Sequence, residues 1–134
     1  MIWNNATLKE IAQSQSSWVV DEKGDCPSIS NDEGIDAYIY AGEQQIIAET
    51  ALFPAAMVTD NAAMNDLILR THHLLPLTTI CINKIGGEDF YTAFGSLSVD
   101  SKDSVIIEEI ETLFANVREF MELYKDHLTK ETAA

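Results

Sequence analysis

The stretch that decides the fold runs from residue 78 to residue 97 and reads TTICINKIGGEDFYTAFGSL. Residues 78–85 are rich in β-branched side chains, and residues 90–97 form a second strand-like run. Gly86-Gly87 lies between the two runs and is a strong signal for a tight turn. So short a turn joins only antiparallel strands, because parallel strands need a long crossover connection. The stretch therefore predicts an antiparallel hairpin and argues against a doubly wound α/β sheet.

A second hairpin is predicted upstream of the first. Residues 35–41 alternate apolar and polar side chains with a period of two, which is the pattern of a strand with one buried face. Gly42-Glu43 is suited to a turn, and residues 45–53 continue as a strand that Pro54 ends. These runs predict a second antiparallel pair.

The first third of the chain contributes less to the predicted sheet. Residues 18–20 could form a short strand, whereas residues 21–33 are acidic and rich in turn-forming residues, so they are predicted to be a solvated loop. Counted together, the runs predict an antiparallel sheet of about five strands.

Helices are predicted at the N-terminus, in the middle and at the C-terminus of the chain. Residues 7–10 fit a capping box and would start a first helix that ends near residue 15. A second helix is predicted to begin at Asp60 or Asn61 and to be ended by Pro76. The expected fold class is therefore α+β, with residues 1–134 as a single domain and residues 129–134 as a polar tail.

The third helix is predicted to follow a cap at Ser101 and to run over residues 105–128, with an apolar stripe at helical spacing. The stripe consists of Ile106, Ile110, Leu113, Val117, Phe120 and Tyr124. Such a helix is about 36 Å long, and a compact domain of this size has a diameter of about 36 Å. Either the sheet covers the stripe completely, or the helix overhangs and its apolar face takes a partner. The second alternative makes a homodimer a reasonable expectation and Phe120 and Tyr124 candidate binding residues.

Charge excludes several classes of function. Twenty-two acidic side chains oppose eight basic ones, which gives a formal net charge of −14. No basic stripe is present to displace counterions from phosphates, so nucleic acid is not an expected partner. Anionic membrane surfaces would repel the chain, and no apolar run approaches the ~20 residues needed to cross a bilayer. The acidity could serve solubility alone or form a functional surface, and both interpretations stay open.

The sequence points to a cytoplasmic protein. Cys26 and Cys81 belong to no CxxC or Cys/His set and are expected to be free thiols in a reducing compartment. The first residues lack a basic region followed by an apolar run, so no signal peptide is visible.

Motifs for catalysis are missing. The chain has no phosphate-binding loop, dinucleotide fingerprint, nucleophile elbow or H-E-x-x-H pair. His72 and His73 are neighbours, about 100° apart on a helix, so they cannot share one metal as residues at i and i+4 do. We therefore expect no enzyme, no cofactor, no metal site and no catalytic residue. The alternative is a small metal-dependent hydrolase that uses His72 or His73 with distant carboxylates.

A protein-binding surface is predicted on one face of the sheet. We expect one set of side chains in the sheet to point toward the helices, namely Ile35, Ile39, Ile80, Ile82 and Phe94. In that arrangement Tyr38, Tyr40, Tyr91 and Cys81 point away from the helices. Tyrosines combine an apolar body with a polar tip and are frequent in binding surfaces. The alternative is that they only stabilise an exposed sheet face through cross-strand contacts.

Three segments and one tryptophan resemble the YjfI family, a bacterial family of small cytoplasmic proteins. The central one, residues 69–78, reads LRTHHLLPLT; the others are residues 94–98 (FGSLS), residues 109–117 (EIETLFANV) and Trp3. The resemblance covers the second half of the chain well and the first half in layout. It supplies no catalytic residues.

The resemblance implies an accessory role in envelope stress, because genes of this family tend to lie beside those for membrane-remodelling proteins like phage shock protein A. The order of elements and the acidity are also similar to the type III secretion chaperone-like fold, whose members dimerise and bind extended client segments. We therefore expect a non-enzymatic, chaperone-like or adaptor domain that binds another protein.

Overall fold

Six antiparallel strands form one sheet in the computed structural model, which describes residues 2–23 and 26–129. The strand order is β1-β2-β3-β4-β6-β5. The strands are β1 (Val19–Lys23), β2 (Cys26–Ser30), β3 (Asp36–Ala41), β4 (Gln45–Pro54), β5 (Thr79–Ile85) and β6 (Glu88–Ser98). The helices are α1 (Asn5–Gln13), α2 (Asn61–Thr71) and α3 (Asp103–Tyr124), with short 3-10 turns at Ala55–Met57, His72–Leu74 and Lys125–His127. The predicted α+β fold with an antiparallel sheet is confirmed, with one strand more than expected.

The additional strand comes from the acidic stretch, which was wrongly predicted to be a loop. Its residues form most of the hairpin β1–β2, in which Val20 lies opposite Ile29. Ile29 is fully buried in the core, and Pro27 and Ser28 are buried beside it. Buried serine and proline do not give the apolar alternation by which a strand is recognised, so β2 could not be predicted from the sequence pattern. Gly24 and Asp25 lie outside the described residues, as do residues 130–134 of the predicted tail.

Several helix boundaries differ from the prediction. The capping box of α1 uses Asn4 and Thr7, because Asn4 Oδ1 accepts from Thr7 N at 2.9 Å and Thr7 Oγ1 accepts from Asn4 N at 3.0 Å. Thr7 is therefore the third helical residue and not the cap. At the other end of the chain, α3 starts after Lys102 instead of Ser101 and stops at Tyr124, four residues before the predicted end.

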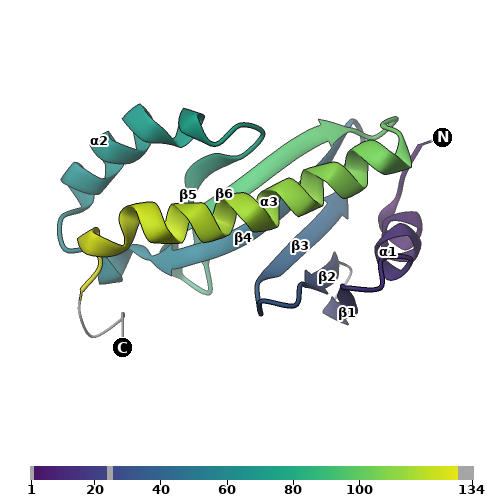
Figure 1. Cartoon of the computed structure of the whole chain (residues 1–134), viewed down its shortest axis with the longest axis horizontal. Coiled ribbons are helices and arrows are strands. Elements are labelled where there is room, and N and C mark those ends of the chain that lie inside the picture. Colours follow the sequence, from purple (N-terminus) through teal and green to yellow (C-terminus); the bar gives the residue numbers. More distant parts are fainter. Residues whose placement is uncertain (1, 24–25, 130–134) are drawn as a thin grey trace.

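All three helices pack on the same face of the sheet. Helix α3 crosses β4 and β6 along the length of the molecule, with α1 at one end and α2 at the other (Figure 1). Leu8 from α1 and Met64 from α2 join the α3 stripe in one core with Ile39 and Ile46 of the sheet. Within residues 2–23 and 26–129, no helix therefore lies on the second face of the sheet.

The chain itself covers the apolar stripe of α3, so the overhanging helix was the wrong alternative. Phe120 and Tyr124 are both fully buried, with their rings stacked at 5.9 Å. The Tyr124 hydroxyl and Thr71 Oγ1 are hydrogen-bonded at 2.8 Å, which ties α3 to α2. Neither side chain reaches the surface, so both are lost as candidate binding residues in this folded state.

Tyr91 is a core residue, and its predicted orientation away from the helices was wrong. It is 1% exposed and lies between Phe53 and Ile82 in register. Its hydroxyl donates to Asn61 Oδ1 at 3.1 Å and to Asn65 Oδ1 at 2.5 Å, both on α2. Phe94, three residues further on β6, consequently points to the opposite face, where the prediction had placed Tyr91.

Replacing Tyr91 with Phe tests this placement. The change deletes a buried donor and leaves the Asn65 acceptor unsatisfied, so we expect the free energy of unfolding to fall by about 1–3 kcal/mol. Urea denaturation measures the loss. Tyr38→Phe is the matched control, because Tyr38 is 37% exposed, and it should change stability by less than about 0.5 kcal/mol. Equal effects of the two variants would contradict the buried position of Tyr91.

Candidate protein-binding surface

The sheet face opposite to the helices carries an aromatic surface that we call the open face. It is defined by Tyr38, Tyr40, Ile47, Glu49, Cys81 and Phe94. Strand register brings these side chains together: Tyr38 lies opposite Glu49, and Glu49 lies opposite Phe94, so the three form one cross-strand row. Tyr40 and Ile47 form the next row. Side chains directly opposite each other on one face are in contact range, so the rows form a continuous surface.

The open face is neither core nor ordinary solvated surface. Tyr38 is 37% exposed, and the other five side chains are half-buried although no helix packs on them. The neighbouring Thr92 hydroxyl on this face is buried and has no hydrogen-bond partner. Aromatic and aliphatic side chains that shield one another in this way offer a partner apolar area without requiring much ordering of side chains.

Glu49 is the acidic residue among the six that define the open face. It stands between Tyr38 and Phe94 and has no hydrogen bond or ion pair within the described ranges. Burial raises the pKa of Glu49 above its ordinary value of 4.5, because the charged form loses hydration. Burial, and then the nearby Glu49 carboxylate, raise the pKa of both Tyr40 and Cys81. The Cys81 thiol therefore stays protonated, which makes it a poor nucleophile.

A groove continues the surface at the side of Tyr38. Its volume is about 400 Å³, and its apolar lining includes Ile35, Tyr38, Leu52, Val117 and Met121. The pairing of β3 with β4 ends where Tyr38 meets Glu49, whereas β4 continues to Pro54. One edge of β4 therefore faces this groove without a partner strand.

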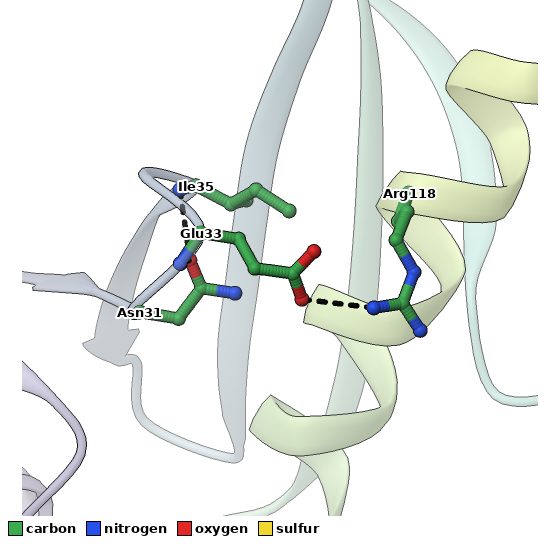
Figure 2. Close-up of polar contacts among 4 residues, drawn as sticks. All are labelled: Asn31, Glu33, Ile35 and Arg118. Carbon is green, nitrogen blue, oxygen red and sulfur yellow. Dashed lines mark hydrogen bonds and ion pairs between the residues drawn. The ribbon is translucent and has the colours of Figure 1, made fainter.

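The loop on the rim of this groove is held in place (Figure 2). Asn31 Oδ1 accepts hydrogen bonds from the backbone N–H groups of Glu33 and Ile35 at 3.0 and 2.9 Å. Arg118 Nη1 donates to Glu33 Oε1 at 2.9 Å, so an ion pair joins the loop to α3. Both partners are about half exposed, and such a pair contributes little to stability. The position of Ile35 is fixed instead by the hydrogen bond from its backbone N–H to Asn31 Oδ1.

His72 and His73 lie elsewhere, on the wall of a pocket that we call the Glu109 pocket. Residues 72–79 other than Leu74 line it, together with residues 94–97, Val105 and Glu109. His72 Nδ1 accepts from the backbone N–H of Ile80 at 3.3 Å, and His73 is exposed. Within residues 2–23 and 26–129, no three His, Cys, Asp or Glu side chains are grouped closely enough to hold a metal ion. The same part of the chain contains no helix of the length and apolarity that a bilayer requires.

Of the five candidate binding residues taken from the sequence, the structure brings Tyr38 and Tyr40 together and buries Tyr91, Phe120 and Tyr124. The sequence prediction missed Phe94, Ile47 and Glu49. For Phe94 the signal was ambiguous, because either alternate set of side chains along β6 could have been the apolar one. For Ile47 and Glu49 the usable signal was the hairpin register, since Tyr40 and Tyr38 lie opposite them.

The chain was also compared with known proteins. Residues 4–128 match the model of a family described as "Uncharacterized protein conserved in bacteria (DUF2170)". The chain belongs to this family. It is also similar to the protein YjfI of Escherichia coli strain K12, with 27% identity over 131 residues that cover 95% of this chain and 98% of the relative. The resemblance seen in residues 69–78 is thereby confirmed.

Solved structures share the fold at low identity. A chain of the HopA1–SchA chaperone–effector complex has a TM-score of 0.61 and 15% identity, covering 87% of this chain and 91% of that one. A chain of the ExsC–ExsE complex has a TM-score of 0.57 and 15% identity, covering 94% and 93%. YbjN from E. coli has a TM-score of 0.67 and 13% identity, covering 93% and 96%. The predicted chaperone-like α+β architecture is therefore confirmed, and likeness at this level concerns the fold alone.

The environment of Glu49 gives a pH-dependent prediction. Its pKa is raised in the folded state, so the folded protein binds more protons than the unfolded chain as the pH falls towards the ordinary value of 4.5. The ionised Glu49 carboxylate therefore destabilises the folded wild-type protein at neutral pH. Below pH 4.5 this destabilisation is absent, because the carboxyl group is protonated in both states. We expect Glu49→Gln to raise the thermal midpoint at pH 7.5 and to lose this gain by about pH 4.

Differential scanning calorimetry across this pH range measures the effect. Glu43→Gln is the matched control, because Glu43 is exposed in the turn that precedes the same strand. A gain that is equally large for Glu43→Gln, or that does not vary with pH, would contradict the desolvated position of Glu49.

Proposed function

We propose that this chain is a non-enzymatic, chaperone-like or adaptor domain that holds a segment of another protein on its open face. The observation that carries the proposal is the cross-strand row of Tyr38, Glu49 and Phe94 on a sheet face that no helix covers. Large rigid side chains on a flat sheet give contact area at a small entropic cost. The strongly acidic composition would discourage acidic partners and favour basic or neutral ones.

Two further features support this function. The groove beside Tyr38 leaves one edge of β4 without a partner strand, and extended segments bind such edges by adding a strand. The fold is similar to chains from the HopA1–SchA chaperone–effector complex and the ExsC–ExsE complex, both of which are assemblies with a second protein. This likeness is an analogy of fold, so the binding site itself has to be tested on this chain.

The finer parts of the proposal concern location and partners. We infer a cytoplasmic protein whose partner belongs to an envelope-stress system of the phage-shock-protein-A type, on the strength of the family resemblance. We also infer a homodimer, since α2 and β5 border an apolar groove of about 240 Å³ that includes Ile68, Leu69 and Ile82. Leu69 is 74% exposed there and extends the groove into an apolar patch that a second molecule would cover.

The function is tested by removing the aromatic surface. In the native host, a tagged Tyr38→Ser, Tyr40→Ser double variant should recover partners at a level at least about tenfold below that of wild type after crosslinking and mass spectrometry, because central aromatic residues dominate binding energy. Leu123→Ser is the matched control, because Leu123 is an exposed apolar residue on the outer side of α3. It should leave recovery unchanged. Equal recovery from the double variant and wild type would rule out the open face.

A further inference from the structure

A second binding site is suggested by the Glu109 pocket, which lies on the helix side of the sheet. Its volume is about 600 Å³. Three segments that are far apart in the sequence form it: the connection from α2 to β5 (residues 72–79), residues 94–97 of β6, and the N-terminal half of α3. Phe94 borders both the open face and this pocket. The inference nevertheless does not depend on the proposed function, because the carboxyl group that carries it lies against Gly95 on the helix side of β6.

The carboxyl group of Glu109 is the chemically unusual part of the pocket. Glu109 is 9% exposed, and its carboxyl group has no hydrogen bond and no ion pair with any described residue, the two nearby histidines included. Burial, with a smaller contribution from the charge of Glu108, raises its pKa above the ordinary value of 4.5. The carboxyl oxygens are not fully buried, so a cation that enters the pocket can reach them and offset the desolvation cost of the charged form.

The backbone keeps Glu109 in this position. Gly95 has no side chain, and a Cβ at this residue would overlap Glu109 Oε1 and come within 3.0 Å of the Leu77 carbonyl oxygen. The carboxyl group therefore rests directly on β6. It has taken the space that a side chain on β6 would otherwise fill, so it lies at the base of the pocket and not at its rim.

The connection beside Glu109 is held by hydrogen bonds. Asn116 Nδ2 donates to the Pro76 carbonyl oxygen at 2.8 Å and to Thr78 Oγ1 at 2.7 Å, so α3 holds the connection that encloses the pocket. Leu77 lies between these two residues with φ at +74°, a conformation that leucine seldom adopts. A connection fixed at both sides in this way gives a preformed pocket.

The edge of β6 beside the pocket has room for an extended segment. Strand β5 begins at Thr79, opposite Phe94, so residues 95–98 of β6 are paired with β4 alone. Their other edge has no partner strand among the described residues. The Ser98 carbonyl oxygen already accepts from Ser101 N at 3.1 Å, and a strand-like peptide can use the remaining backbone groups. An arginine at a position of such a peptide that faces the helix side would lie beside Gly95, against which the Glu109 carboxyl group rests.

We propose that the Glu109 pocket binds an arginine side chain from an extended segment of a protein partner, which pairs with the Glu109 carboxylate. A guanidinium group fits this site better than an ammonium group, since it is planar, weakly hydrated and able to bind a carboxylate through two parallel hydrogen bonds. The apolar lining from Leu75, Leu77 and Leu97 suits the aliphatic part of the side chain. The net charge of −14 favours the approach of a basic segment.

The test uses two synthetic peptides, acetyl-VTRTV-amide and the same peptide with citrulline, the uncharged isostere of arginine, at its centre. Each is titrated into the full chain and followed by amide chemical shifts in NMR. We expect the arginine peptide to bind at least about tenfold more tightly than the citrulline peptide. The largest shifts should fall on residues 95–97 and 105–109.

Two isosteric variants locate the effect. Glu109→Gln should reduce binding of the arginine peptide to the level of the citrulline peptide, whereas Glu108→Gln, which removes the same charge from the exposed neighbouring residue, should leave the preference for arginine intact. A preference for arginine that survives Glu109→Gln would mean general attraction to an acidic protein and would overturn the proposal. Equal binding of the two peptides to wild type would also overturn it, and that comparison requires no variant to fold. A dimer in light scattering that Glu109→Gln dissociates would assign the pocket to a second copy of the chain and would equally overturn it.

Discussion

Burial of one face of α3 against β4 and β6 is the contact on which the other elements depend. The sheet is covered on one side only, so the apolar area that stabilises it must come from that side, and α3 is the one helix that crosses its centre. The two ends of the chain are tied to the same layer. Trp3 Nε1 donates to the Ser101 carbonyl oxygen at 2.7 Å just before α3, and Thr129 N donates to the Met57 carbonyl oxygen at 2.9 Å just after it.

Because the helices cover only one face of the sheet, the other face is accessible to a partner. A second layer of helices would have hidden the open face, and a purely polar surface would have made it inert. Instead the uncovered side carries aromatic rings and one desolvated carboxylate, and the covered side keeps a pocket where α3 passes the free edge of β6. Each of the two sites contains a glutamate whose pKa burial raises and which has no cation beside it in the described part of the chain. If the two proposals hold, both surfaces would favour a basic partner over an acidic one.

Most of the architecture could be predicted because local signals were strong. The diglycine turn predicted one hairpin, and the alternation over residues 35–41 predicted another. Every residue of the predicted apolar stripe of α3 is buried in the structure. The open face was only half predictable. Along β6, Tyr91 and Phe94 compete for the core, and the choice is made by contacts distant in sequence: Asn61 and Asn65 take the Tyr91 hydroxyl, while Glu109 fills the space above Gly95. The sequence of β6 alone contains no information about these partners. The face of the sheet to which the Tyr91 and Phe94 rings point could therefore not be predicted from this strand.

The strand order has a consequence for how the chain is made. Strand β4 ends at Pro54, but β6, which pairs with β4 on the side away from β3, begins only at Glu88. The helix that covers both strands begins at Asp103. At a synthesis rate of ~5–20 residues per second, a nascent chain has an unpaired β4 edge for a few seconds and an uncovered apolar layer for longer. The N-terminal hairpins can form early because they are local, whereas closure of the core has to wait for the last thirty or so residues. The ribosome-bound intermediate is thus the state most exposed to aggregation, and the C-terminal helix is the part of the chain that ends this exposure.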